Sequence, residues 1–343
     1  MANDATFDIG KRTIDRIKSA SSVHEIDTRK STERWLCEEL SRGFTAVEPV
    51  FHLVKGGLLH AQITRETGDL DITFARKMSE SEILRDIHQM APLLAAKGIE
   101  IAKIGDMQNL IINGDGGMRF PITAMVGGTR INTHIDVTGG MRHLPAKIKD
   151  ETGQVRKVQK SFGSVFFKGQ QPLEAYYQPF EAQAADKLAT VVLRPDTTRW
   201  KDFDDLSRLY QMGLSRTKIA VELAHKLSYM YKTARDVLLA LPEVPAAMSF
   251  DYAREKAAHW QMWQQRNGRT TTTDFEAVAC DSRNLYFDVR KVLVDSYQPV
   301  RKPKVERKPT VAEVKQAFGG SDSNIIQMGR YRDPGSLTFR PKF

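Results

Sequence analysis

The periodicity of apolar residues changes near the middle of this chain, and the change constrains its fold more than any other feature. In the first ~140 residues, short runs alternate polar and apolar side chains, as half-buried strands do. From about Phe180 onward, apolar residues recur at helical spacing instead. At 343 residues the chain is also longer than one ordinary core supports. The sequence therefore predicts an α+β fold, in which a mixed sheet with helices is followed by a mostly helical domain.

Individual elements follow from these patterns and from the residues that begin and end them. The predicted strands are 51–54, 69–75, 99–104, 118–126 and 130–137, and Gly114 to Gly117 predicts a hairpin turn. The predicted helices are 31–42, 79–97, 180–193, 202–212, 217–240 and 251–265, with a short one at 310–318. Ser31 or Thr32 should cap the first helix, and Pro92 should kink the second or split it at Ala91.

The same patterns divide the chain into three expected parts. Residues 1–178 should form the α/β domain, and residues 179–298 the helical domain. From Pro299 a basic, proline-punctuated linker leads into a poorly ordered tail, which ends at residue 343. Ten Lys or Arg and four Asp or Glu lie in 299–343, so this segment carries +6 of the formal net charge of +9.

A basic balance of this kind suits a polyanionic partner such as RNA, because phosphates neutralised by Lys or Arg release their counterions. Two other interpretations of the tail stay open. It could be a solvated segment without a partner. Alternatively, its apolar residues could dock onto the body of the protein as a structural strap; these are Ile325, Ile326, Leu337 and Phe339.

The chain carries no sequence signal for a membrane or for secretion. No stretch reaches the roughly 18 uncharged apolar residues that a membrane span needs, and residues 1–18 lack the apolar segment of a signal peptide. Cys37 and Cys280 are far apart and fit no metal-ligand or disulfide pattern. We therefore expect a cytoplasmic protein that has no membrane partner and no structural zinc.

Two aspartates on the predicted strand 69–75 carry the strongest chemical signal. Asp69 and Asp71 are two residues apart, so both project from one face of the strand while their neighbours face the core. Adjacent carboxylates repel each other unless a cation lies between them, and such pairs commonly hold Mg²⁺ against a triphosphate. Two unrelated surface aspartates on an edge strand would give the same pattern.

Gly56 and Gly57 lie shortly upstream, directly after Lys55 at the end of the predicted strand 51–54. Glycine lets the backbone approach a phosphate closely, and a turn of free N–H groups forms an anion-binding nest. An ordinary turn would use the same residues. However, only residues 58–68 separate the glycines from the paired aspartates, which makes chance a poorer explanation.

A third carboxylate can join from the predicted strand 130–137, where His134 and Asp136 share one face. Together with Asp69 and Asp71, Asp136 would complete a three-carboxylate cluster that can hold two metal ions. His134 is either an RNA contact or, more simply, a histidine that faces solvent.

The helical part contributes a second group of charged residues. Lys187 lies off the centre of the apolar stripe of the predicted helix 180–193. Asp202 and Asp205 are three residues apart, so they share one face of a helix. These two aspartates could instead simply stabilise the dipole at a helix N-terminus.

The order of these motifs resembles the AbiEii/AbiGii toxin family of type IV toxin–antitoxin systems, which has the DNA polymerase β-like nucleotidyltransferase fold. The resemblance covers about residues 35–215. It implies that Asp69, Asp71 and Asp136 bind two Mg²⁺ ions and that these three and Asp202 are catalytic. The nucleotide would be bound by Lys55, Gly56, Gly57, Arg65, Thr67, Lys187 and Asp205. Gly57 stands where many related enzymes have a serine, so only backbone donors are available to the phosphate there.

The resemblance also implies a function. The protein would move a nucleoside monophosphate from an NTP to an RNA hydroxyl, at the 3′ end of a tRNA, and act as a toxin or in phage defence. Its cognate antitoxin would be encoded nearby and would act without a stable complex. Two alternatives stay open: transfer to a small-molecule or protein hydroxyl, and a catalytically inactive RNA-binding module.

Overall fold

A computed structural model describes most of the first 297 residues. The described residues are 2–23, 26–48, 52–59, 67–112, 115–139, 148–149, 155–156, 160–162, 170, 173–194, 197–228, 231, 234–266 and 273–297. Arg65, Gly114, the predicted helix 310–318 and the tail 299–343 lie outside these ranges. None of the helices within them has both the length and the apolar character that crossing a membrane requires.

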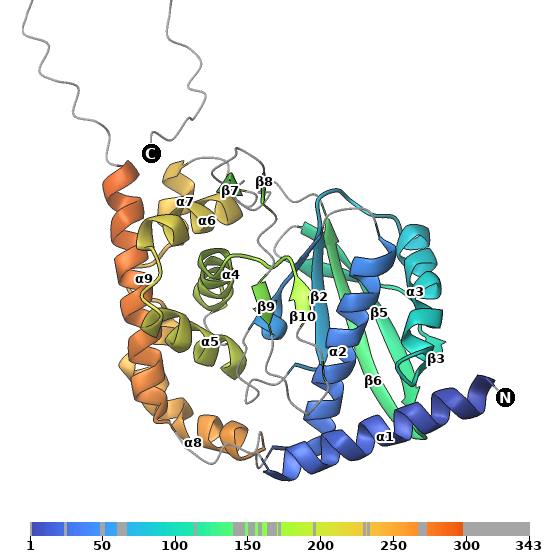
Figure 1. The fold of residues 1–343 in the computed structure, drawn as a ribbon. Coiled ribbons are helices and arrows are strands. Elements are labelled where there is room, and N and C mark those ends of the chain that lie inside the picture. Colours follow the sequence, from blue (N-terminus) through green and yellow to red (C-terminus); the bar gives the residue numbers. More distant parts are fainter. Residues whose placement is uncertain are drawn as a thin grey trace, which may run out of the picture. The chain divides into compact units, whose positions relative to one another are not determined.

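A six-stranded mixed sheet organises the first part of the chain (Figure 1). Its strands are β1 (His52–Val54), β2 (Asp69–Phe74), β3 (Ile99–Ile104), β4 (Gln108–Ile112), β5 (Asp115–Val126) and β6 (Thr129–Gly139). They lie in the order β1-β2-β6-β5-β3, and β4 also pairs with β5. The β2–β6 pair is parallel and the other pairs are antiparallel. The predicted mixed sheet is therefore confirmed.

All five predicted strands are present within one or a few residues of their expected bounds, but the sequence analysis missed β4. The run Gln108–Ile112 has no alternation of polar and apolar residues that would mark it as a strand. It forms a hairpin with β5, in which Ile112 pairs with Asp115. Gly116 and Gly117 therefore lie inside β5 instead of in the turn, so the predicted turn was placed too far along the chain.

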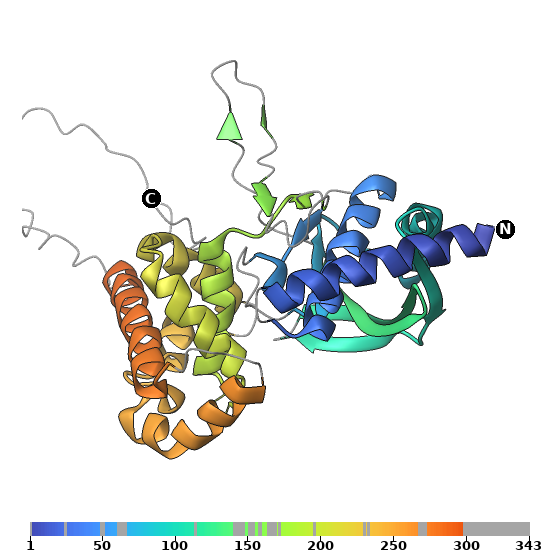
Figure 2. The ribbon, with the colours of Figure 1, turned by 60° about the horizontal axis from the view of Figure 1, so that its bottom comes forward.

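Three helices lie on one face of this sheet, as Figure 2 shows for the blue and cyan elements. They are α1 (Ala2–Val23), α2 (Thr28–Val47) and α3 (Glu80–Ala95). The buried side chains of the central strands pack under them, because alternate residues of a strand point to opposite faces. These side chains include Leu70, Ile72, Phe74, Ile131, Ile135 and Val137. The polar residues between them face the other way.

Two predictions about these helices, the cap of the first and a split of the second, were wrong. Asp27 caps α2, because its side chain accepts a hydrogen bond of 2.9 Å from the Lys30 N–H. Ser31 and Thr32 lie inside the helix, where their hydroxyls donate to backbone carbonyls four residues earlier. The helix α3 continues through Pro92 without a split, since a proline removes only one helical hydrogen bond and Ala96 still donates to the Pro92 carbonyl.

The second part of the described chain is helical, as predicted. Its helices are α4 (Phe180–Val192), α5 (Trp200–Gln211), α6 (Arg216–Ser228), α7 (Ala234–Ala240), α8 (Phe250–Arg266) and α9 (Phe275–Tyr297), with the 3₁₀ turn η2 (Ala246–Met248) between α7 and α8. A second 3₁₀ turn, η1 (Gly56–Leu59), follows β1. The predicted single helix 217–240 is two helices, because α6 ends at Ser228, whose hydroxyl bonds back to the His225 carbonyl. The sequence analysis included the residues of α9 in the helical domain without predicting a helix there. It also missed α1, whose buried apolar residues are sparse.

Two clusters of buried apolar residues stabilise these two parts. One runs from Ile14 to Ala175 and lies between the sheet and its helices, and the other runs from Ala184 to Leu293. Phe180 packs against both clusters. By its internal contacts the chain divides into Met1–Tyr297 and Gln298–Phe343. The predicted boundary at residue 178 stays a prediction.

The chain enters α4 directly from the edge of the sheet. Four short strands precede it, β7 (Ile148–Lys149), β8 (Val155–Arg156), β9 (Lys160–Phe162) and β10 (Leu173–Ala175), paired as β7–β8 and β9–β10. After β10, Val54 of β1 donates a backbone hydrogen bond of 2.8 Å to Tyr176, and Gln178 donates one of 2.9 Å to Val54. Because α4 begins two residues later, its first turns lie beside the end of β1.

Three glycines let α1 dock onto the end of the sheet. A Cβ added at Gly10 of α1 would lie 2.4 Å from the backbone nitrogen of Gly127 and 2.6 Å from the carbonyl oxygen of Gly98. Gly98 and Gly127 also have positive φ angles of 83° and 53°. Only residues without a side chain allow three backbone segments to meet this closely.

We therefore predict that Gly10→Ala destabilises the protein, although alanine is the better helix former by about 1 kcal/mol. The added Cβ would collide with backbone atoms, so α1 would have to move away. We expect this to lower the free energy of unfolding by about 1–3 kcal/mol. Gly43→Ala in α2 is the matched control, since its Cβ would meet the flexible Met90 side chain 2.7 Å away. Thermal unfolding should show the larger loss for Gly10→Ala; an equal or smaller loss would contradict this docking.

Candidate active site

Charged side chains from three neighbouring strands meet on the face of the sheet opposite α1, α2 and α3. In the parallel pair β2–β6, Asp71 lies opposite Asp136 and Asp69 lies opposite His134. In the antiparallel pair β5–β6, Arg119 lies opposite Asp136. Residues that are paired across strands have adjacent side chains on the same face. The strand register therefore brings together the three carboxylates that the sequence analysis selected.

His134 belongs to this cluster, although the sequence analysis favoured a solvent-facing role for it. Its Nε2 lies 3.6 Å from a carboxylate oxygen of Asp69 and 3.8 Å from one of Asp136. One ligand atom from each of these three residues lies within 4.8 Å of the others. The sequence did show that His134 shares a face with Asp136, but only the parallel pairing with β2 brings it beside Asp69.

Arg119 is a second residue that the sequence analysis missed. Its Nε donates a hydrogen bond of 2.8 Å to Oδ1 of Asp136, and its Nη2 donates one of 2.6 Å to Oδ2. This two-point geometry is the strong form of an arginine–carboxylate pair. An ionised carboxylate has about four lone-pair directions, so Asp136 keeps acceptor capacity beyond its arginine.

Gly56 must be glycine because of Asp71. Its φ of 66° lies in the left-handed region, which residues with a side chain rarely adopt. A Cβ at this position would also lie 2.1 Å from Oδ2 of Asp71. The backbone N–H of Lys55 donates a hydrogen bond of 2.9 Å to the Asp71 carbonyl, which fixes the turn against β2. The glycine turn and the paired aspartates are thus one structural unit.

The pKa of Asp71 is raised from its ordinary value to about 6. Burial is the main cause, because it disfavours the charged form, and the negative charges of Asp69 and Asp136 add to it. The positive charges of Lys55 and Lys187 act in the opposite direction without cancelling the effect. The cluster therefore carries an excess of negative charge that a cation would offset.

Lys187 reaches this cluster from α4. Gln183, one helical turn earlier on the same face, donates a hydrogen bond of 3.2 Å from Nε2 to the carbonyl oxygen of Gly56. That contact holds α4 against the glycine turn. The charge of Lys187 acts on Asp71, as the direction of its effect on the Asp71 pKa shows.

Asp202 and Asp205 of α5 hold the Lys187 ammonium group. Its Nζ lies 2.5 Å from Oδ1 of Asp202 and 3.1 Å from Oδ2 of Asp205, and Arg199 lies 2.5 Å from the other Asp202 oxygen. Both aspartates are buried. Their carboxylates therefore bind the Lys187 ammonium group and do more than stabilise the start of a helix.

Asp186, next to Lys187, forms a separate ion pair with Lys226 of α6. Gln178 donates a hydrogen bond of 2.9 Å to its second oxygen. Burial pushes the Asp186 pKa up, but the charges of Lys226 and Lys55 and these hydrogen bonds outweigh it, so the pKa lies below its usual value. Lys55 thus acts electrostatically on carboxylates of both the sheet and α4.

The remaining predicted residues are Lys55, Gly57, Thr67 and Arg65. Thr67 is buried just before β2, and Gly57 is buried within η1. Lys55 Nζ donates a hydrogen bond of 3.5 Å to the Thr138 hydroxyl. Arg65 lies outside the described residues. Among the described residues, the structure therefore groups Lys55, both glycines and the three sheet carboxylates, with Lys187 and its two aspartates alongside.

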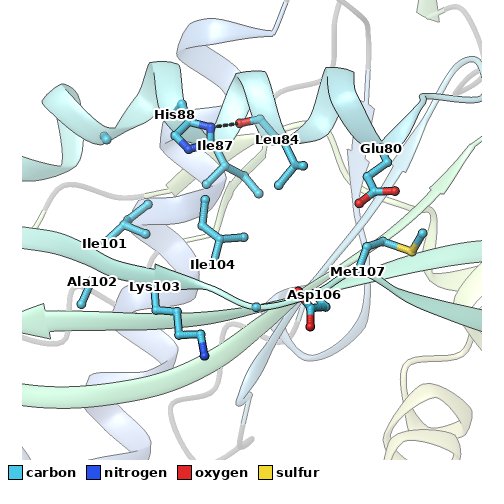
Figure 3. A pocket seen from close by; sticks show the side chains of 12 residues that line it. Glu80, Leu84, Ile87, His88, Ile101, Ala102, Lys103, Ile104, Asp106 and Met107 are labelled. Carbon is cyan, nitrogen blue, oxygen red and sulfur yellow. Dashed lines mark hydrogen bonds between the residues drawn. The ribbon is translucent and has the colours of Figure 1, made fainter.

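A cavity of about 490 Å³ lies in a different place, between α3 and β3 (Figure 3). Apolar side chains such as Leu84, Ile87 and Ile101 face it, with Glu80 and Asp106 at one end. None of the residues predicted to be functional lines this cavity. The chemistry thus belongs to the polar face of the sheet.

Comparisons with known proteins give one family match and two similar solved structures. The family described as "Nucleotidyl transferase AbiEii toxin, Type IV TA system" matches residues 53–279. Among solved structures, the chain is similar to an H. pylori protein assigned as a nucleotidyltransferase, with 12% identity over 80% of this chain and 100% of that chain and a TM-score of 0.40. It is also similar to JHP933 from Helicobacter pylori, with 14% identity over 79% and 95% and a TM-score of 0.41. No curated protein matches.

The raised pKa of Asp71 gives a pH-dependent prediction. The folded state binds the Asp71 proton more tightly than the unfolded state does, so ionised Asp71 lowers stability above about pH 6. Without divalent metal, this loss should disappear as the pH falls from 6 toward 4. Asp71→Asn should therefore raise the free energy of unfolding at pH 8 by on the order of 2 kcal/mol, and not at pH 4.

Asp186→Asn is the matched control, because the pKa of Asp186 is lowered and not raised. This variant should lose stability at pH 8, since the pair with Lys226 is broken. Chemical unfolding in EDTA at both pH values measures the two effects. A destabilised Asp71→Asn at pH 8 would show that burial and carboxylate repulsion do not make ionised Asp71 unfavourable in the folded protein.

Proposed function

Since this chain belongs to the AbiEii nucleotidyl transferase toxin family of type IV toxin–antitoxin systems, we propose that it moves a nucleoside monophosphate from an NTP to an RNA hydroxyl. The acceptor we favour is the 3′ end of a tRNA. The observation that carries the proposal is the close contact between the glycine turn and Asp71 of the Asp69–Asp71 pair, with Lys187 close enough to act on Asp71. These residues would bind both a nucleotide and its metal ion.

The residues of the sheet cluster fit a divalent cation. Three carboxylates face one another there, burial and the charges of the neighbouring carboxylates raise the pKa of Asp71, and the buried Nε2 of His134 has no hydrogen-bond partner among the described residues. Asp69, Asp71 and Asp136 would hold the metal, for which we propose Mg²⁺ at one or two positions. When bound, the metal would neutralise charge on the triphosphate and on the attacking oxygen.

The turn and α4 would bind the phosphates. Backbone N–H groups at Gly56 and Gly57 can approach a phosphate closely, because neither residue has a side chain. Lys187 would supply a positive charge from α4, and Lys55 a second one from the end of β1. Asp202 and Asp205 keep the Lys187 ammonium group in place, so we propose that they position it. The catalytic role that the family resemblance implies for Asp202 stays a prediction.

The chemical step exchanges a phosphoanhydride bond of the NTP for a phosphodiester bond to the RNA. The oxygen of the RNA hydroxyl attacks the α-phosphorus of the NTP and forms a new P–O bond. The bond from the α-phosphorus to the bridging oxygen breaks, and pyrophosphate leaves with the electron pair. The hydroxyl proton passes to a carboxylate of the cluster and then to water. The protein contributes mainly position and charge to such a step.

The net charge of +9 favours RNA over a small cationic acceptor. Transfer to a small-molecule or protein hydroxyl would use the same site. The two alternatives differ in which acceptor becomes labelled when the protein is given a labelled NTP. The cognate antitoxin, which we expect to be encoded nearby, would act without a stable complex.

The first prediction concerns the carboxylates. With α-³²P-labelled NTPs, Mg²⁺ and total tRNA, the protein should label tRNA, and Asp69→Asn should reduce the rate by at least about 100-fold. Mutating a residue that only contacts a metal ligand already lowers activity by roughly 10–100-fold, so loss of a ligand itself should lower it further. Asp274→Asn, an exposed aspartate just before α9, is the control. Labelling at the wild-type rate by Asp69→Asn would disprove the site; labelling of small molecules or protein alone would favour the alternative acceptor.

The second prediction concerns Lys187. Lys187→Ala should weaken binding of a non-hydrolysable NTP by about 10-fold, because a phosphate loses one charge-assisted contact of about 1.5 kcal/mol. Lys218→Ala removes an exposed lysine of α6 and should leave the affinity unchanged. Isothermal titration calorimetry measures both. Equal affinities for the two variants would mean that Lys187 stabilises the helices and does not bind nucleotide.

A further inference from the structure

We propose that His134 supplies a nitrogen ligand to the metal centre, and that the centre consequently binds Mn²⁺ more tightly than Mg²⁺. The inference rests on the proposed function, because it concerns the metal of the same site. It differs from that proposal in the ligand set and in the metal that this set selects.

The position of the imidazole is fixed by the backbone. His134 lies in the middle of β6, with Asp69 opposite on β2 and Pro121 opposite on β5. Its side chain is 29% exposed, so the ring is accessible from the polar face of the sheet without being free to leave it. A ligand that is held by a sheet costs little conformational entropy when a metal binds.

The ring nitrogen points into the cluster but makes no hydrogen bond there. At 3.6 Å from Asp69 and 3.8 Å from Asp136, Nε2 is beyond hydrogen-bond distance of both carboxylates. The atom is buried and has no hydrogen-bond partner among the described residues. A buried polar atom without a partner is costly, and a cation between the imidazole and the two carboxylates would satisfy it.

The spacing of the three ligand atoms suits such a cation. One atom each from Asp69, His134 and Asp136 lies within 4.8 Å of the other two. Ligands at about 2.0–2.2 Å from one ion are separated by no more than about twice that length. Small side-chain adjustments would therefore bring all three atoms into contact with a single ion.

The chemistry of this set selects a transition metal. Mg²⁺ prefers oxygen ligands in near-ideal octahedral geometry, whereas imidazole nitrogen binds first-row transition ions well. Arg119 strengthens the bias, because its two hydrogen bonds withdraw electron density from Asp136. With one carboxylate weakened as a ligand, the nitrogen of His134 makes a larger share of the binding. Mn²⁺ accepts both oxygen and nitrogen, so it is the probe we choose.

The test is a binding measurement on the full-length protein without nucleotide. The free Mn²⁺ signal in electron paramagnetic resonance gives the Mn²⁺ affinity, and competition with Mg²⁺ gives the affinity ratio. Wild-type protein should bind Mn²⁺ at least about 10-fold more tightly than Mg²⁺. His134→Ala should weaken Mn²⁺ binding by about 10–100-fold and Mg²⁺ binding much less. His134→Asp should restore an all-oxygen set and shift the ratio toward Mg²⁺.

Two controls make the result specific. His88→Ala changes a histidine of α3 that bonds to the Leu84 carbonyl, so its affinity ratio should match the wild type. Circular dichroism at each titration temperature confirms that the variants are folded, and His134→Asp gives a second variant should alanine destabilise β6. An unchanged ratio in both folded His134 variants would overturn the proposal.

The metal-binding result can be told apart from the result of the transferase assay. If the wild type labels tRNA but the His134 variants keep the wild-type ratio, the nitrogen ligand is wrong and the transferase proposal stands. If the His134 variants lose Mn²⁺ but the wild type labels no acceptor, the ligand assignment stands and the transferase proposal fails.

Discussion

Repulsion among three carboxylates is the constraint around which the polar face of the sheet is arranged. The parallel pairing of β2 with β6 places Asp71 directly opposite Asp136, and Asp69 two residues away on the same face. Such proximity costs free energy, and together with burial, the larger cause, it raises the pKa of Asp71. The protein lowers that cost only in part. Arg119 binds Asp136 at two points, while Lys55 and Lys187 act on Asp71 from outside the sheet.

The helix α4 connects this charge cluster to the helical part of the chain. Residues 176–178 pair with β1, and Phe180 then packs against both clusters of buried apolar residues. Gln183 bonds to the Gly56 carbonyl, so the first turns of α4 are fixed against the glycine turn. Lys187 follows one turn later and is held by two buried aspartates of α5. The packing of α4 on α5 therefore helps determine where a positive charge stands relative to Asp71.

Close backbone approach is used twice for different purposes. At Gly56 it makes room for the Asp71 carboxylate beside a turn with a positive φ angle. At Gly10, Gly98 and Gly127 it lets α1 rest against two turns at the end of the sheet. The first contact shapes the candidate site and the second is structural. Treating each glycine as a generic turn former predicts neither contact, because both depend on how the chain folds back on itself.

The sequence by itself determined the class of fold and most of the candidate residues, because both depend on short-range periodicity. Alternation placed Asp69 and Asp71 on one strand face, and helical spacing marked the second part of the chain. Tertiary structure alone decided which strands are neighbours, and so brought His134 beside Asp69 and Arg119 onto Asp136. It also brought Lys187 against Asp202 and Asp205, for which the sequence allowed a simple role in stabilising a helix N-terminus. Strand order, register and helix docking arise from burial of apolar surface over long chain separations, and local patterns do not encode them.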